Sequence, residues 1–455
     1  MDRRHFLGTV AASLVGQAAH SAKGADKFFS NGRPPNFIVI LCDDLGYGDI
    51  EPTGGRQIKT PNLRKMAAQG VTFSDFYASA NVCTPSRAGL LTGRYPVRTG
   101  LGYQVILRED DRVLPTSEVT IGKALKAKGY RTGLFGKWHL GHLGDEWFPT
   151  RHGFDRFAGI PYSHDMAPLP FYVMDGEAPP REEKAEVPQL QQRFYSEAEH
   201  FIEANADAPF FIELALSAPH LPAYPISPYL GRSKAGAYGD VVEEIDAIVG
   251  RLLDKLQALS LDRDTIVLFT SDNGPWYEGS SGGLRQRKGG GGYDGGYRVP
   301  MIAWGPGRFP AGLKTGAIAM SIDVLPTLCA LAGVVQPAQI EIDGRDLAPL
   351  LTGKTALSPH DELVLFDNED VVGIRTQRWK YVSGDYYRGR LFPTEDKYPQ
   401  LYDVLADPSE SYSVADRFPD VLADMRARLS GARARFAPFK SRELPKAFRG
   451  AGSGH

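Results

Sequence analysis

The chain has 455 residues, of which 42% are hydrophobic and 23% charged, and its formal net charge is −2. This length favours one large domain with a smaller second one, and the charge balance excludes a global field that attracts nucleic acid or an anionic membrane surface. Any anion-binding site must therefore be local. The three cysteines are too few for a disulfide framework. Cys42 and Cys329 lie in apolar runs and are predicted core residues, which leaves Cys83 to explain.

The first residues resemble a twin-arginine signal peptide. Arg3 and Arg4 precede an apolar stretch at 6–19, and small residues follow near Ala22. The stretch is too short to cross a bilayer, and no later segment has a continuous apolar run of that length. We therefore predict a signal peptide at 1–24 and a soluble protein without a membrane anchor, exported to the periplasm or secreted by the twin-arginine route. The alternative is an accidental arginine pair before a buried helix.

Beyond residue 34, buried strands are predicted to alternate with helices. Continuous apolar runs bounded by polar residues are typical of strands in a parallel sheet, and apolar residues three and four apart are typical of helices. The predicted strands are 37–41, 132–135, 210–216 and 266–269, and the predicted helices are 63–69, 121–128 and 241–256. Short strands and turns are predicted at 371–382 and 401–403, and irregular loops at 166–186 and 224–237.

Each of the four predicted strands ends in polar side chains able to bind a metal or transfer a proton. They are Asp43 and Asp44, Lys137 and His139, His220, and Asp272 and Asn273. In open α/β sheets, sites form outside the carboxyl ends of the strands, so we expect these groups to meet. The aspartates and Asn273 are hard oxygen donors, which suit calcium or magnesium better than zinc. The alternatives are a turn at 271–274 and structural roles for the lysine and the histidines.

A further feature is the run Cys-Thr-Pro-Ser-Arg at 83–87. Pro85 suits the first turn of a helix, so Cys83 is predicted at a helix N-terminus, where free N–H groups and the helix dipole favour an anion. A capped helix with an ordinary half-buried thiol is the alternative for so short a motif. Lys288 lies in a basic, glycine-rich run at 285–292, which also fits a flexible loop.

In order and spacing, these segments resemble the formylglycine-dependent type I sulfatases, from about residue 35 to 440. The resemblance is carried by Leu-Cys-Asp-Asp-Leu-Gly-Tyr-Gly-Asp at 41–49, the run at 83–87, Gly-Lys-Trp-His-Leu-Gly at 136–141, Pro-His at 219–220, Ser-Asp-Asn-Gly at 271–274, and Lys288 ahead of Tyr-Asp-Gly-Gly at 293–296. The segment Gly-Ile-Pro-Tyr-Ser-His-Asp at 159–165 is more particular, because it resembles the group of arylsulfatase A and N-acetylgalactosamine-6-sulfatase.

The family resemblance implies an α/β fold, an alkaline-phosphatase-like α/β/α sandwich with a smaller C-terminal α+β subdomain. The catalytic domain is expected at 35–350 and the subdomain at 351–440. The last residues, 441–455, are rich in glycine, serine and alanine after Phe448, and we expect them to form a disordered tail.

The resemblance also implies an unusual nucleophile. Cys83 would be oxidised to formylglycine by a formylglycine-generating enzyme, and the hydrate of this aldehyde would attack the sulfur of a sulfate ester. The ligands of one calcium ion, which would polarise the sulfate group, would be Asp43, Asp44, Asp272, Asn273 and the modified Cys83.

By the same resemblance, Arg87 would stabilise the ionised diol, and Asp272 would act as the base for the attacking hydroxyl. Lys137, Ser163 and Lys288 would bind the substrate and offset charge on its sulfate oxygens. These roles predict a sulfuric ester hydrolase that releases inorganic sulfate from a sulfated carbohydrate or an aryl sulfate.

Two histidines complete the implied mechanism. His220, helped by Lys288, would contact the substrate and protonate the departing alcohol. His139 would take the proton of the second hydroxyl, so that sulfate is expelled and the aldehyde returns.

Two other functions are compatible with the sequence. A phosphoester or phosphonate hydrolase of the same superfamily shares the fold and a metal-assisted nucleophile. A non-catalytic sulfated-glycan binding protein would keep Cys83 as a thiol. Tyr172, Tyr224, Tyr229 and Trp276 lie in predicted loops and could stack on a sugar or an aryl ring, with loop packing as the alternative for each.

Overall fold

The computed structural model describes residues 33–335, 340–387, 390–395, 397–443 and 445. The predicted signal peptide at 1–24 and most of the predicted tail, residues 444 and 446–455, lie outside the described residues.

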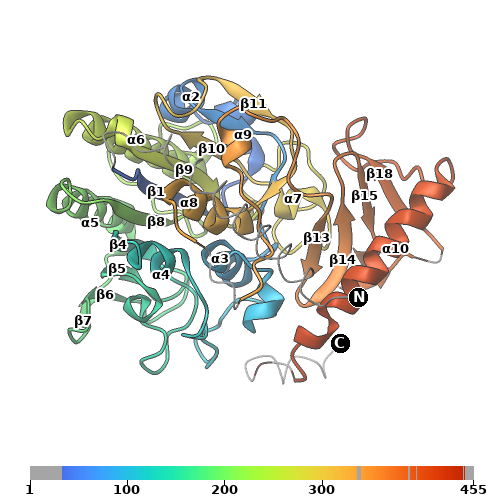
Figure 1. Ribbon diagram of the computed structural model, residues 1–455, viewed down its shortest axis with the longest axis horizontal. Coiled ribbons are helices and arrows are strands. Elements are labelled where there is room, and N and C mark those ends of the chain that lie inside the picture. Colours follow the sequence, from blue (N-terminus) through green and yellow to red (C-terminus); the bar gives the residue numbers. More distant parts are fainter. Residues whose placement is uncertain (1–32, 336–339, 388–389, 396, 444, 446–455) are drawn as a thin grey trace, which may run out of the picture.

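A ten-stranded sheet forms the centre of the molecule (Figure 1). In spatial order its strands are β11 (Leu313–Thr315), β2 (Val71–Phe73), β10 (Met301–Trp304), β9 (Thr265–Ser271), β1 (Asn36–Asp43), β8 (Phe210–Pro219), β4 (Arg131–Lys137), β5 (Arg156–Ile160), β6 (Pro170–Asp175) and β7 (Arg181–Lys184). The inner strands β9, β1, β8, β4 and β5 run parallel. The four strands predicted from apolar runs are all inner strands, and each is longer than predicted.

The prediction of an irregular loop at 166–186 is wrong, because this segment contains β6 and β7. The antiparallel pairing starts from β5, where Ala158 lies opposite Val173, and continues to β7, where Tyr172 lies opposite Glu182. Such pairing is a tertiary effect that a short apolar run does not reveal. The segment at 224–237 is irregular, as predicted, up to the start of the next helix.

Helices cover both faces of the sheet, which gives the predicted α/β/α sandwich. Alternate residues of β1 enter two different cores, since Val39 and Leu41 pack on one face and Ile38 and Ile40 on the other. The first face is covered by α3 (Cys83–Thr92), α4 (Ile121–Lys126), α8 (Val324–Ala332) and α9 (Ala348–Leu351), and the second by α2 (Pro61–Ala68), α5 (Leu190–Ala204) and α6 (Gly236–Ala258). None of the described helices is both long and apolar enough to cross a membrane.

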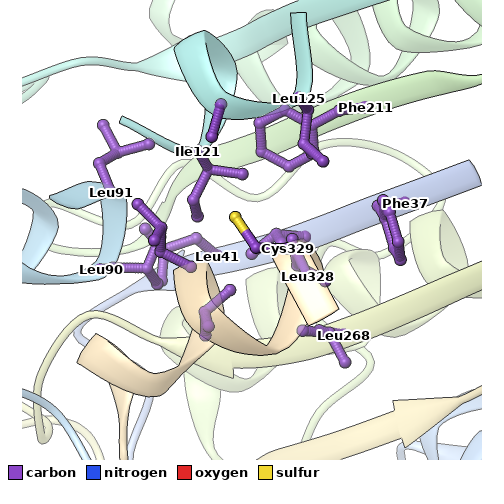
Figure 2. Packing of buried hydrophobic residues seen from close by; sticks show 14 of the residues in the cluster. Phe37, Leu41, Leu90, Leu91, Ile121, Leu125, Phe211, Leu268, Leu328 and Cys329 are labelled. Carbon is purple, nitrogen blue, oxygen red and sulfur yellow. The ribbon is translucent and has the colours of Figure 1, made fainter. Parts of the chain in front are cut away.

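The core beneath α3 fixes the position of Cys83 at the start of this helix. Leu90 and Leu91 of α3 share one apolar cluster with Ile121 of α4 and Cys329 of α8 (Figure 2). Both cysteines predicted in the core are buried. Because α3 is buried over its whole length, its first turn is held rigidly above the sheet.

A smaller α+β region lies beside the sandwich, at the right of Figure 1. Its antiparallel sheet consists of β13 (Leu363–Asp367), β14 (Asp370–Arg375), β15 (Trp379–Val382) and β18 (Gln400–Asp403), and it packs against α10 (Pro419–Phe436). The short strands predicted at 371–382 and 401–403 are therefore present. The other short elements are α7 (Asp294–Tyr297), β3 (Phe76–Tyr77) paired with β12 (Ala319–Met320), and the hairpin of β16 (Gly384–Tyr387) and β17 (Arg390–Pro393).

Candidate active site

The polar ends of the inner strands meet at the carboxyl edge of the sheet, as predicted. A cleft of about 570 Å³ opens at this edge, and its lining includes Cys83, His139, Ser163, His220 and Lys288. The other candidate residues are at most 2% exposed, and they are Asp43, Asp44, Arg87, Lys137, Asp272 and Asn273. Hydrogen bonds and ion pairs connect the two sets, so the fold assembles the residues singled out in the sequence into one site.

Cys83 is the first residue of α3. Its Sγ lies 3.3 Å from Asp43 Oδ1, 3.9 Å from Asp44 Oδ1 and 3.3 Å from Lys288 Nζ. Burial, reinforced by the charges of Asp272 and Asp43, raises the pKa of the Cys83 thiol well above its usual value. Because the thiolate is the reactive form, an unmodified Cys83 is a poor nucleophile at neutral pH.

Three carboxylates surround this sulfur, and they belong to Asp43, Asp44 and Asp272. One ligand atom from each lies within 4.8 Å of the others and of Cys83 Sγ. Asn273 adds an amide whose Oδ1 is buried without a hydrogen-bond partner, while its Nδ2 donates to Asp44 Oδ1 at 2.7 Å. A buried oxygen without a partner is costly. This set of mostly hard oxygen donors fits a calcium or magnesium ion.

Two buried cations and one partly buried cation face these carboxylates. Burial alone would raise the pKa of Asp43, but the positive charge of Lys137 and the nearby His220 hold it well below its usual value. A divalent cation added to this balanced set would leave an excess of positive charge, which suits an anionic ester group. The ion pairs are Lys137 to Asp43 (2.6 Å), Lys288 to Asp44 (2.8 Å) and Arg87 to Asp272 (2.8 Å).

Arg87 fixes the carboxylate of Asp272. Its Nε donates to Asp272 Oδ2 at 3.0 Å, and its Nη1 donates to the Lys137 carbonyl at 3.0 Å. Burial, together with the charge of Asp43, raises the pKa of Asp272 to about 6. No hydrogen bond joins Arg87 to Cys83 within the described part of the chain, but Arg87 Nη2 also lies 3.6 Å from Asp43 Oδ1.

His139 is held as a neutral imidazole. Its Nε2 donates to the Ile106 carbonyl at 3.0 Å, which leaves the lone pair on Nδ1, and this atom is buried without a hydrogen-bond partner. Burial, with the positive charges of Lys137 and Arg87, lowers the pKa of His139 well below its usual value. His139 (φ 57°) and Asp44 (φ 67°) both have left-handed backbone, a strained conformation that is frequent at functional sites.

His220 and Ser163 are neighbours in the cleft, with Ser163 Oγ 3.5 Å from His220 Nε2. The other ring nitrogen of His220, Nδ1, donates to the Leu221 carbonyl at 2.6 Å. Nε2 lies 3.7 Å from Asp44 Oδ2. When protonated, Nε2 can therefore donate a proton to a group bound between Ser163 and the acidic residues.

Two supporting residues were not identified in the sequence. Thr84 Oγ1 donates to the His139 carbonyl at 3.0 Å and accepts the Ile106 N–H at 3.0 Å, so it ties the first turn of α3 to the segment of His139. Asp367, at the end of β13 in the C-terminal region, also lines the cleft. The threonine is part of the short motif, but nothing in the sequence pattern indicates that Asp367 reaches this site.

Of the four aromatic residues predicted to stack on a ligand, Trp276 lines the cleft. Tyr172 instead lies on β6 and packs against Trp147, with ring centroids 5.3 Å apart. Tyr224 packs edge-on against His164, with ring centroids 5.9 Å apart. The packing alternative therefore describes Tyr172, whereas Tyr224, which is 42% exposed, and Tyr229 lie outside the lining of this cleft.

Paired carboxylates and cations at the carboxyl ends of parallel strands, next to a buried helix N-terminus, equip a site for metal-assisted hydrolysis of an anionic ester. Within an α/β/α sandwich of this kind, they place the protein among the alkaline-phosphatase-like hydrolases.

Comparison with known proteins narrows this class. A family model described as Sulfatase matches residues 35–334, and a model described as N-sulphoglucosamine sulphohydrolase, C-terminal, matches residues 292–435. The chain belongs to the sulfatase family. Sulfatases are enzymes that hydrolyse sulfate esters, so the predicted family and enzyme class are confirmed.

Individual relatives agree with this assignment. The chain is 37% identical to arylsulfatase A of Homo sapiens over 444 residues, which cover 87% of each chain. It is 39% identical to N-acetylgalactosamine-6-sulfatase of Canis lupus familiaris over 352 residues, which cover 70% of this chain and 66% of that protein. Its structure is similar to that of the PsFucS1 sulfatase from Pseudoalteromonas sp., with a TM-score of 0.84, 27% identity, and 94% and 96% of the two chains covered.

Proposed function

We propose that this sulfatase releases inorganic sulfate by means of a formylglycine made from Cys83 and one bound calcium ion. The observation that carries the proposal is the position of Cys83 Sγ, 3.3 Å from both Asp43 Oδ1 and Lys288 Nζ at the lining of the cleft. A formylglycine supplies a hydrated aldehyde as the source of the attacking oxygen, which the buried, protonated thiol cannot provide.

The metal would be held by four side chains and the modified Cys83. When bound, it supplies positive charge beside the sulfate oxygens. Its oxygen donors would be Asp43, Asp44, Asp272 and Asn273, which the acidic cluster and the unpaired Oδ1 of the amide support.

Binding of the sulfate group falls to three further side chains. Lys137 and Lys288 are buried or nearly buried cations, and Ser163 adds a hydroxyl donor next to His220. Preorganised donors in a site that excludes water stabilise developing charge without further reorganisation. Lys288 and Ser163 both line the cleft, whereas Lys137 lies behind it.

Three groups would move protons. Asp272, whose carboxylate is held by Arg87, would accept the proton of the attacking hydroxyl. His220 Nε2, assisted by Lys288, would protonate the leaving alcohol. His139 would accept the second hydroxyl proton at Nδ1, the lone pair that its hydrogen bond to the Ile106 carbonyl leaves available.

The proposal includes the domain limits and the route of the protein. We assign the catalytic domain to 35–350, the C-terminal subdomain to 351–440 and a twin-arginine signal peptide to 1–24, which directs the protein to the periplasm or outside the cell. A formylglycine-generating enzyme would act before export, because the twin-arginine route carries folded proteins.

The proposal is tested by peptide mass and by sulfate release. Protein made in a host with the modifying enzyme is digested, and the peptide of Cys83 should carry the mass of the aldehyde, whereas the peptides of Cys42 and Cys329 should keep the thiol mass. The same preparation is assayed on sulfate and phosphate monoesters side by side. An unmodified Cys83 with no sulfate release, in a host that modifies a control sulfatase, contradicts the proposal, and faster phosphate release favours the phosphoester alternative.

A further inference from the structure

An exposed pair of aromatic side chains lies at the edge of the cleft. Trp276 is 43% exposed and Tyr277 is 73% exposed, and both line the cleft. Their ring centroids are 4.7 Å apart with an interplanar angle of 72°. Exposed aromatic side chains that lie together at the edge of a cleft are candidates for contact with a ligand.

The backbone of this pair is fixed to the catalytic groups. Arg287 Nη1 donates to the carbonyls of Trp276 (2.7 Å), Tyr277 (3.2 Å) and Gly279. The next residue, Lys288, donates its N–H to the Pro275 carbonyl at 3.0 Å. The segment of the aromatic pair and the backbone of Lys288 therefore belong to one hydrogen-bonded unit. Arg287 uses a guanidinium nitrogen on these carbonyls, which makes it a positioning residue for the pair.

The rest of the cleft lining complements the aromatic rings. The volume of about 570 Å³ exceeds the needs of a sulfate group and leaves room for the ring that bears it. Gln104 and the carboxylates of Asp165 and Asp367 are among the other lining residues. Aromatic faces on one side and hydrogen-bonding amide and carboxylate groups elsewhere match a sugar, whose C–H face is apolar and whose hydroxyl groups are donors and acceptors.

We propose that Trp276 and Tyr277 form a sugar-binding subsite that holds the pyranose ring carrying the sulfate ester. The substrate class is then a sulfated carbohydrate rather than a free aryl sulfate. This inference rests on the proposed sulfate-ester hydrolysis, since it concerns the part of the substrate next to the sulfate group.

The test compares full-length, formylglycine-containing enzyme with its Trp276→Ala and Tyr277→Ala variants. The substrates are monosulfates of galactose, N-acetylgalactosamine, N-acetylglucosamine and fucose, and inorganic sulfate is measured as an inhibitor. We expect KM for the best sugar sulfate to rise by about twofold to tenfold in each variant, the range that corresponds to the loss of one aromatic contact. The inhibition constant of inorganic sulfate should not change, because sulfate alone does not reach the aromatic pair.

Two further variants sharpen the test. Trp276→Phe keeps an aromatic face and should recover most of the affinity for the sugar sulfate. Tyr398→Ala removes an equally exposed aromatic side chain, 64% exposed, that is outside the cleft lining, and should leave both constants unchanged.

The outcomes separate the two proposals. An unchanged KM in both alanine variants overturns the subsite, and so does wild-type enzyme that hydrolyses an aryl sulfate but none of the four sugar sulfates. A wild-type enzyme that releases sulfate from no ester of either kind contradicts the proposed function itself.

Discussion

The protein buries two clusters of charged side chains, which contain similar residues but have different roles. The strand-end cluster lies at the candidate active site and consists of Asp43, Asp44, Asp272, Arg87, Lys137 and Lys288. The interdomain cluster joins the sandwich to the C-terminal region and consists of Asp294, Glu410, Lys380, Arg298 and Arg375 together with Tyr77. Both combine carboxylates with cations in surroundings where an unpaired charge is expensive.

Short ion pairs hold the interdomain cluster together. Lys380 Nζ lies 2.5 Å from Asp294 Oδ1 and 2.7 Å from Glu410 Oε1, and all three side chains are 0% exposed. Tyr77 donates its hydroxyl to Asp294 Oδ2 at 3.0 Å. None of these residues lines the cleft. The cluster connects α7, β15 and the segment after β18, so its role is to hold the C-terminal sheet against the sandwich.

The strand-end cluster is open toward a cleft and is incompletely satisfied. Asn273 Oδ1 and His139 Nδ1 beside it are buried without hydrogen-bond partners, and Asp44 has a left-handed backbone. Such costs persist at functional sites, where a ligand or a reaction uses the unsatisfied atoms. The comparison shows that buried charge alone does not identify an active site. The two clusters differ in position, because only the strand-end cluster contributes a residue, Lys288, to the lining of the cleft.

Among the variants that test this contrast, replacement of Cys83 should have the largest effect on turnover. Cys83→Ala removes the source of the attacking oxygen, so sulfate release should fall by roughly four or more orders of magnitude, as for the loss of other covalent nucleophiles. The fold should persist, because no core contact depends on the thiol. Sulfate release and thermal unfolding measure the two effects.

Cys329→Ala is the matched control for that variant. Cys329 is equally buried, 1% exposed, but lies in the apolar core beneath α3. Its loss should lower the free energy of unfolding by about 1–2 kcal/mol through the cavity left behind and leave turnover by the folded enzyme unchanged. Near-normal turnover in Cys83→Ala would contradict the proposed mechanism.

The second prediction concerns the interdomain cluster. Lys380→Met leaves Asp294 and Glu410 buried without their shared cation, so the free energy of unfolding should fall by about 3–5 kcal/mol. Turnover by the folded enzyme at low temperature should stay within about twofold, because the cluster lies outside the cleft. Denaturant unfolding and sulfate release provide the two measurements.

Lys397→Met, at an exposed lysine, is the control and should change neither. A loss of turnover without a loss of stability would assign this cluster a catalytic role.

The third prediction returns to the strand ends. Asn273→Ala removes the amide oxygen that has no partner, and calcium affinity should fall by about 10-fold to 100-fold, the usual cost of a lost metal-site group. Thermal unfolding of metal-free protein titrated with calcium measures the affinity, since a bound ion stabilises the folded state. Asn205→Ala, at the end of α5, keeps the site intact and should leave the calcium titration unchanged. Equal affinities in Asn273→Ala and wild type would remove Asn273 from the ligand set.

The strand-end cluster was accessible to sequence reasoning because its signals are local. Asp43 and Asp272 each close a continuous apolar run, and the rule that parallel strands end at one edge brings them together. The position of Cys83 at the start of a helix followed from Pro85 for the same reason.

The remaining features depend on contacts between distant segments. Asp367 reaches the cleft from β13, where its Oδ1 accepts from Asn81 Nδ2 at 3.4 Å across 286 positions of sequence. The Ile106 carbonyl determines the tautomer of His139, and pairing with its partner strands determines that the β6 segment forms a strand. The interdomain cluster likewise joins Asp294 to a lysine 86 positions later. A local pattern carries no record of such partners.

The smallest expected effect is a change in the pH dependence of stability, which again distinguishes the interdomain cluster from the strand-end cluster. Burial, with the charge of Asp294, raises the pKa of Glu410 from its ordinary 4.5 to about 7 despite the opposing charge of Lys380. Between about pH 4.5 and 7 the folded state therefore binds more protons at Glu410 than the unfolded state does, so this residue makes stability fall as the pH rises through that window.

Glu410→Gln removes the titration. With saturating calcium, the free energy of unfolding of the wild type, relative to the variant, should fall by on the order of 2 kcal/mol from about pH 5 to 7.5. If the free energies of unfolding of wild type and Glu410→Gln, measured with denaturant, changed in parallel with pH, then Glu410 would not titrate in this window. If the Glu410→Gln variant instead had a shifted pH optimum of turnover but the same slope of stability against pH as the wild type, the interdomain cluster would be coupled to the chemistry. The contrast between the two clusters would then fail.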